Sequence, residues 1–259
     1  MTLWRRFSAL SLLLLLTLSL VNCGGGPDVE RHLGYLRADP FPRLVIEIDY
    51  VGDSKPHPNL EADLEEDLHE VVDKPKGIDI VLDERIASRG ENHRWETGEL
   101  IDLSEDATDL EVADNATRIH VLYLDGHSAS DGDGGLVLGL AWANSSIAIF
   151  KNSVLRGCQL GGMPTPELQE MLCEKAEKSI LVHELGHVFG LVENPLPMLQ
   201  DHRDREHGRH CTNKKCVMYW QHRIGRIFAI LKGRIMNGNE NALGFGEFCL
   251  EDMAAAREG

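Results

Sequence analysis

The stretch TPELQEMLCEKAEKSILVHELGHVFGL, residues 165–191, limits most strongly which folds this chain can adopt. Thr165 is a good helix N-cap, and Pro166 suits the first helical position. Apolar residues recur at helical spacing through the stretch, and Gly190 supplies a natural stop. The sequence therefore predicts one long, largely buried helix whose last turns carry the residues HELGH.

Two histidines and a glutamate in those last turns suggest a metal site. His183 and His187 lie about 40° apart around a helix axis and roughly 6 Å apart along it, so both imidazoles can reach one ion. Glu184 lies about 100° further round, where it can take a proton from a metal-bound water. Zinc is the metal that this pattern predicts, because it accepts neutral nitrogen ligands and keeps an open position in catalytic sites.

Two histidines do not hold a catalytic zinc ion by themselves, so a third ligand is expected in the segment after the helix. Glu193 stands three residues past Gly190, where an HExxHxxGxxH pattern places its third histidine. The residues in this segment leave the choice open among His202, His207, His210, Glu193 and Glu206.

The segment HCTNKKCVM runs from His210 to Met218. A histidine followed at this interval by a methionine resembles the metzincin family, and HC-x4-C-x-M resembles its archaemetzincin branch. The resemblance implies a zincin-like α/β (α+β) fold: a mixed twisted sheet, an active-site helix and a smaller irregular C-terminal lobe. It also implies His210 as the third zinc ligand, Met218 as a buried Met-turn, and residues 191–209 as an insertion. Leu138 and Trp142 would then line a peptide cleft, or else be ordinary core residues.

An alternative hypothesis differs only in the identity of the third zinc ligand. Glu206 follows His187 by 19 positions, which resembles the spacing in thermolysin-like gluzincins. Gluzincins present that glutamate on a second helix, whereas Gly208 and the neighbouring arginines make a poor helix here. His202 is a further alternative ligand.

The cysteines of the C-terminal third suggest a second site. Archaemetzincins hold a structural zinc ion with four cysteines, and Cys211 and Cys216 match the first pair. Cys249 resembles the start of the second pair, but Asp252 stands where the last cysteine would be. The resemblance implies a zinc site of three thiolates and a carboxylate, and a Cys211–Cys216 disulfide is the alternative.

The N-terminus predicts export. Two arginines precede an apolar run that ends near Val21, as in a secretory signal, and the run is shorter than the roughly 20 residues of a comfortable membrane span. LVNC resembles a bacterial lipobox with Cys23 as the lipidated residue, although Asn22 departs from the small residue usual there. We expect a signal peptide over 1–22 and a cell-envelope lipoprotein. Ordinary cleavage nearby, with secretion, or an uncleaved anchor are the alternatives. A Cys158–Cys173 disulfide suits such a compartment.

The rest of the chain predicts one domain that alternates strands with few helices. Residues 23–42 are expected to be a tether, and 43–259 a catalytic domain made of subdomains 43–190 and 191–259. A strand, helix, strand order at its start favours a mixed or parallel sheet. The expected strands are 43–51, 77–84, 118–126, 136–143 and 146–150. The expected helices are 58–72 and the long one described above, with a glycine-rich loop before the latter. Residues 85–117 are expected to be loop, with or without a short helix.

The net charge limits the possible partners. With 42 acidic and 26 basic residues, the formal charge is −16, which disfavours binding to a phosphate backbone. Two functions fit: a zinc endopeptidase that acts on peptides or proteins, tethered to the membrane by lipid, or a non-catalytic zinc-binding lipoprotein that stores or senses metal through residues 202–216. The second function does not require Glu184.

Overall fold

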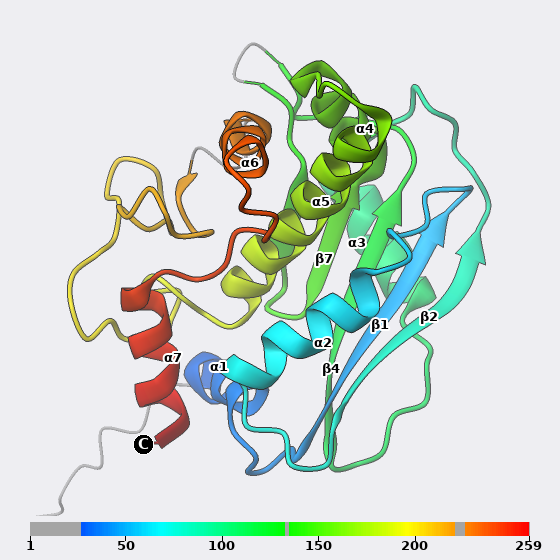
Figure 1. The fold of residues 1–259 in the computed structure, drawn as a ribbon. Coiled ribbons are helices and arrows are strands. Elements are labelled where there is room, and N and C mark those ends of the chain that lie inside the picture. The colour runs from blue at the N-terminus through cyan, green and yellow to red at the C-terminus, as the bar shows by residue number, and fades with distance from the viewer. Residues whose placement is uncertain (1–26, 133–134, 221–225, 259) are drawn as a thin grey trace, which may run out of the picture.

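A five-stranded sheet in the order β2-β1-β4-β7-β6 forms the centre of the molecule (Figure 1). The computed structural model describes residues 27–132, 135–220 and 226–258. The parallel strands are β1 (Arg43–Val51), β2 (Ile78–Ile86), β4 (Ala116–Leu124) and β7 (Ser146–Phe150). The edge strand β6 (Gly139–Trp142) runs antiparallel to β7. A small parallel pair, β3 (Arg94–Trp95) and β5 (His127–Ser128), lies apart from the sheet. The predicted mixed sheet and its five strands are confirmed.

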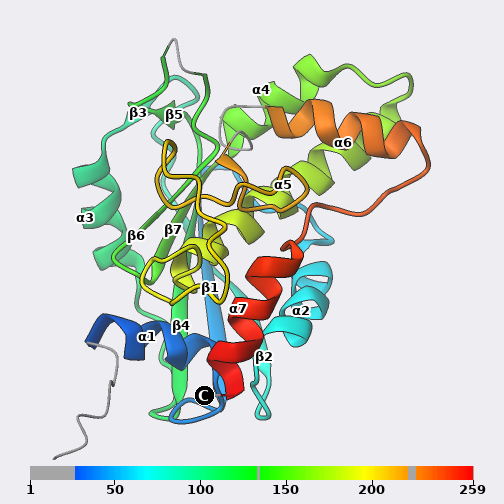
Figure 2. The same ribbon diagram turned by 90° about the vertical axis from the view of Figure 1, so that its left-hand side faces the viewer.

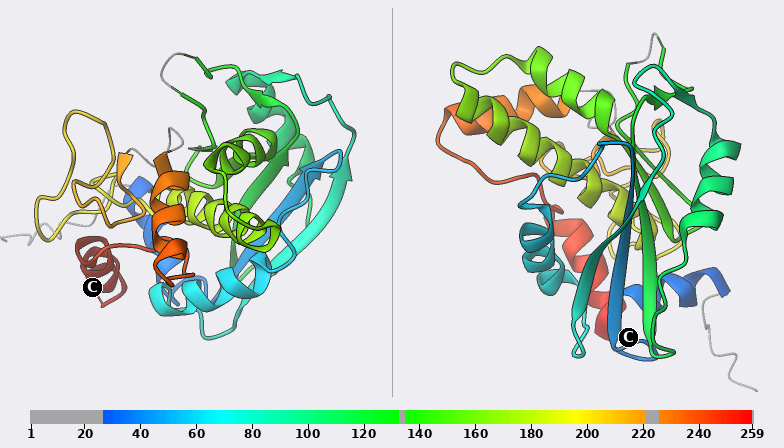
Figure 3. Two further views of the ribbon diagram at one scale, coloured as in Figure 1. Left: turned by 45° about the horizontal axis from the view of Figure 1, so that its top comes forward. Right: turned by 90° about the vertical axis from the view of Figure 1, so that its right-hand side faces the viewer.

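Helices cover both faces of this sheet. Helices α2 (Leu60–Val71) and α5 (Pro166–Val188) pack on one face, and α3 (Thr97–Ala107) covers the other (Figures 2 and 3). A buried apolar cluster that includes Leu44, Ile46 and Ile48 of β1 fills the space under α2 and α5. A smaller cluster around Trp95 and Leu100 lies on the α3 side. Burial on both faces explains why the strands are rich in Val, Ile and Leu.

The α3 side also contains a buried network of hydrogen-bonded side chains that is separate from the predicted metal site. His120 Nε2 donates to Asp49 Oδ2 over 2.8 Å, and Ser104 Oγ lies 2.8 Å from His120 Nδ1. All three side chains are buried. Because each of these polar groups has a partner, the hydrogen-bond network can hold α3 against the sheet without an unpaired buried charge.

Three segments differ from the sequence predictions. Residues 27–36, within the expected tether, form helix α1 (Pro27–Leu36), which packs its buried Tyr35 and Leu36 against the core. The expected glycine-rich loop after β7 is helix α4 (Lys151–Gly161). The C-terminal lobe is not irregular throughout, because it contains α6 (Arg226–Met236) and α7 (Glu247–Glu258). These helices are short and depend on packing against other elements: α4 and α6 pack on α5, and α7 packs on α1 and α2.

The predicted Cys158–Cys173 disulfide is present and joins α4 to α5. Among the described helices, none is both long and apolar enough to cross a lipid bilayer. The predicted signal peptide and the proposed lipidation residue Cys23 lie outside the described residues.

Candidate metal centre

The helix α5 carries the first two candidate ligands in its last two turns. The Thr165 side chain accepts a hydrogen bond from the backbone N–H of Leu168, which caps the helix start as predicted. At the other end Gly190 adopts a φ of +83°, a conformation that favours glycine, and the chain turns away. The helix therefore stops directly after presenting His183 and His187.

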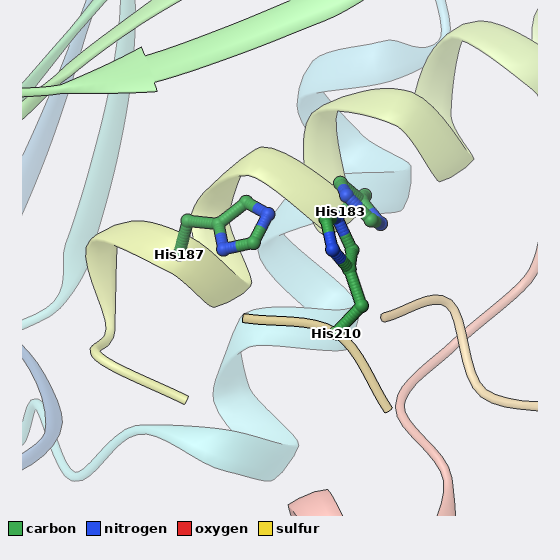
Figure 4. Close-up of side chains that lie close together, drawn as sticks. All are labelled: His183, His187 and His210. Carbon is green, nitrogen blue, oxygen red and sulfur yellow. The ribbon is translucent and has the colours of Figure 1, made fainter. Parts of the chain in front are cut away.

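Three histidine rings converge at this point (Figure 4). The ring centroids of His183 and His187 are 4.9 Å apart, and that of His210 lies 5.2 Å from the first and 5.1 Å from the second. One ring nitrogen from each residue lies within 4.8 Å of the other two. Because His210 comes from the loop after α5, the tertiary structure brings together three donors that the sequence separates.

Backbone carbonyl groups set the orientation of two of these rings. His183 Nδ1 lies 2.7 Å from the Val217 carbonyl oxygen, and His210 Nδ1 lies 2.6 Å from that of His207. A carbonyl oxygen only accepts hydrogen bonds, so each Nδ1 carries the proton and each neutral ring keeps its lone pair on Nε2. Hydrogen bonds of this kind orient metal-binding histidines in proteins.

Met218 lies against the turn of α5 that separates the two helical histidines. It is fully buried, and a Cβ atom added to Gly186 would lie 2.3 Å from its sulfur. The glycine in HELGH therefore makes room for Met218, whose carbonyl also accepts the backbone N–H of Cys211 over 2.8 Å. The methionine and the His210 segment are thus held against the same part of α5.

Glu184 lies on a neighbouring side of α5, against the edge strand β6. It is only 4% exposed, and a Cβ atom on Gly139 would lie 2.8 Å from both its Cγ and its Oε1. The backbone of β6 therefore approaches this carboxylate closely because residue 139 has no side chain. Leu138, one of the predicted cleft residues, is instead 1% exposed and belongs to the core.

The closeness of Gly139 and Glu184 gives a prediction. In the Gly139→Ala variant the new methyl group is expected to push the Glu184 carboxylate out of place. If Glu184 is the general base that the sequence predicts, peptide hydrolysis should then fall by about 10- to 100-fold. Zinc content should stay unchanged, because the three histidines lie elsewhere. Steady-state kinetics with metal analysis of the same samples measures both quantities. Wild-type turnover in this variant would show that the contact has no role in placing Glu184.

Three other candidate third ligands are exposed or paired with other residues. Glu193 is exposed and pairs with Arg203 over 2.7 Å, and this hydrogen bond lowers its pKa. Glu206 is exposed on the loop. His207 pairs with Asp204 over 2.8 Å and stacks on Trp220. None of these three belongs to the group that His183 and His187 form within the described residues.

His202, the remaining candidate, belongs to a second cluster of possible ligands. Its Nδ1 lies 3.3 Å from Cys211 Sγ, and Cys216 Sγ lies 3.6 Å from Cys249 Sγ. These four residues are buried. The alternative Cys211–Cys216 disulfide is not formed, since both cysteines keep their thiols in the structure. Hydrogen bonds among the three thiols lower the pKa of Cys211 and raise the pKa values of Cys216 and Cys249.

No family model matches the chain, and no curated protein matches it. Among solved structures, the chain is similar to archaemetzincin from Methanopyrus kandleri, with 15% sequence identity and a TM-score of 0.45. The match covers 83% of this chain and 96% of the archaemetzincin chain.

Proposed function

We propose that this protein is a zinc-dependent endopeptidase in which His183, His187 and His210 hold the metal and Glu184 is the general base. The single observation that carries the proposal is the convergence of three imidazoles beside a buried carboxylate on the same helix. Three neutral nitrogen donors suit zinc and leave a coordination position open, as in catalytic sites.

The residues divide the chemistry between them. A zinc ion in this site would supply Lewis acidity and lower the pKa of water to about 7. The Glu184 carboxylate takes a proton from the water whose oxygen bonds to the peptide carbonyl carbon. It then returns the proton to the amide nitrogen as the C–N bond breaks, which releases the two peptide fragments. The carbonyls of Val217 and His207 keep two of the imidazoles oriented throughout.

Burial of Glu184 argues for the enzyme rather than for a protein that only binds zinc. Placing a carboxylate at 4% exposure has a desolvation cost, and metal storage by three histidines does not require it. Proton transfer does require a carboxylate at that position. The binding protein remains the alternative that experiment must exclude.

Removing the metal tests the proposal directly. We expect the purified protein to cleave members of a mixed peptide library, to lose more than about 90% of this activity with 1,10-phenanthroline, and to regain it when zinc is added back. Mass spectrometry of the fragments identifies the cleaved bonds. A protein that binds zinc tightly but cleaves no peptide would support metal storage instead.

We also propose that the protein acts outside the cytoplasm on peptide or protein substrates, attached to a membrane through Cys23. The Cys158–Cys173 disulfide supports an oxidising compartment. The acidic net charge of −16 supports the absence of nucleic-acid partners.

A further inference from the structure

The second cluster differs from the four-ligand site that the sequence implied. In that site Asp252 takes the fourth position beside three cysteines. In the structure both of its carboxylate oxygens are already in use: Oδ2 lies 2.8 Å from His202 Nε2, and Oδ1 accepts the backbone N–H of Leu199 over 2.7 Å. Asp252 therefore points at a histidine rather than at the thiols.

His202, rather than Asp252, is the residue that lies beside the thiols. A carboxylate accepts, so His202 Nε2 donates its proton to Asp252 and Nδ1 is the ring nitrogen that faces Cys211. Nδ1 lies 3.3 Å from Cys211 Sγ, and one ring nitrogen of His202 lies within 4.8 Å of Cys249 Sγ. A carboxylate behind a histidine is the usual outer partner of a metal-binding imidazole.

His202, Cys211 and Cys249 each offer one donor atom within 4.8 Å of the other two, and Cys216 adjoins this group through Cys249. Two distances between donor atoms can be compared with those around a zinc ion. With Zn–S near 2.3 Å and Zn–N near 2.0–2.1 Å, tetrahedral geometry puts two sulfurs about 3.8 Å apart and a sulfur and a nitrogen about 3.6 Å apart. The observed distances are 3.6 Å between Cys216 and Cys249 and 3.3 Å between His202 and Cys211.

Backbone groups around the sulfurs also favour thiolates. The N–H of Asn213 points to Cys211 Sγ over 3.4 Å, and the N–H of Gly246 points to Cys216 Sγ over 3.1 Å. Three buried thiols beside a buried histidine leave one sulfur over in any disulfide arrangement, whereas one zinc ion uses all four donors.

We propose that His202, Cys211, Cys216 and Cys249 bind a structural zinc ion as a Cys3His site, with Asp252 as a positioning residue for His202. This proposal does not depend on peptidase activity.

The site also holds the segment that supplies His210. Cys211 follows His210 directly, and the backbone N–H of Thr212 donates to the His202 carbonyl over 2.8 Å. The backbone N–H of Asp204 donates to the His210 carbonyl over 2.7 Å. Because the four donors tie this loop to α7, loss of the structural ion is expected to loosen His210 and to weaken binding at the candidate metal centre.

Cobalt substitution tests the ligand set with a readout other than activity. In the full chain carrying His183→Ala and His187→Ala, which removes the first site, we expect about one Co2+ per chain with a near-ultraviolet charge-transfer band of three thiolates and visible bands of a tetrahedral ion. X-ray absorption of the zinc form of the same variant should fit about three sulfur neighbours and one nitrogen. A metal-free protein with two of the three cysteines in a disulfide, located by peptide mapping, would overturn the proposal.

Further variants in this background separate the ligand from its positioning partner. His202→Ala should bind cobalt at least about 100-fold more weakly, whereas Asp252→Asn should keep the three-thiolate band and bind about 10- to 100-fold more weakly. Asp201→Asn is the matched control, because Asp201 is an exposed acid paired with Arg205. Tight binding by His202→Ala, together with loss of an oxygen ligand in Asp252→Asn, would make the aspartate the ligand and refute the proposal. Success here with no peptide cleavage by the wild-type protein would refute only the proposed enzyme function.

Discussion

The Glu184→Gln variant is expected to lose peptide hydrolysis by about 10²- to 10⁴-fold while it keeps its zinc. Glutamine has nearly the same shape as glutamate, so it can fill the same space against Gly139 of β6. Its amide group does not accept a proton at neutral pH, however, so water loses its base. Kinetics on a cleaved library peptide, with metal analysis of the same sample, measures both properties.

Glu193→Gln provides the matched control for this experiment. Glu193 lies on the loop just after α5, but it is exposed and pairs with Arg203. We expect this variant to cleave peptide at the wild-type rate. If Glu184→Gln retained wild-type activity, Glu184 would not be the base and the proposed mechanism would be wrong. If both variants lost activity equally, the loss would reflect the loop rather than the chemistry.

The His210→Ala variant is expected to lose the catalytic zinc ion and, with it, measurable peptidase activity. Two imidazoles on α5 remain, but a catalytic zinc site normally needs three protein ligands. Zinc content should fall by about one ion per chain. Competition with a chromophoric chelator, followed by metal analysis, measures the number and affinity of the sites that remain.

Two variants of the same loop serve as controls for His210→Ala. Glu206→Ala removes the alternative ligand, and His207→Ala removes a nearby imidazole that pairs with Asp204. Both should retain zinc and activity close to wild type. The opposite pattern, with zinc lost in Glu206→Ala and kept in His210→Ala, would require the loop to move so that the glutamate binds the metal.

The sequence predicted much of the sheet because each strand has its own signal. β1 begins and ends where its alternation of apolar and charged residues predicted. β7 begins and ends where its run of apolar residues predicted. The order strand, helix, strand of β1, α2 and β2 also predicted that the two strands pair in parallel, as observed. α1 was not predicted, although its apolar residues recur at helical spacing, because a ten-residue helix is marginal without the core that Tyr35 and Leu36 contact.

In the candidate metal centre, too, some residue positions follow from local helix geometry and others depend on tertiary packing. The spacing of His183, Glu184 and His187 determined how these three side chains lie on α5, because helix geometry relates residues three and four apart without reference to the rest of the chain. The motif around Met218 favoured His210 through its resemblance to a family. Whether the loop between α5 and His210 could bring that ring to the other two depended on packing that no local pattern encodes.

The sequence by itself determined a long helix with two histidines and a glutamate, and a list of donors that could complete a site. Only the tertiary structure decided how those donors divide between clusters: His210 beside His183 and His187, and His202 beside the cysteines with Asp252 behind it. The physical reason is that helix geometry is repeated at every turn, whereas the course of the loop is set by its buried contacts, including those with α7, which lies far away along the chain.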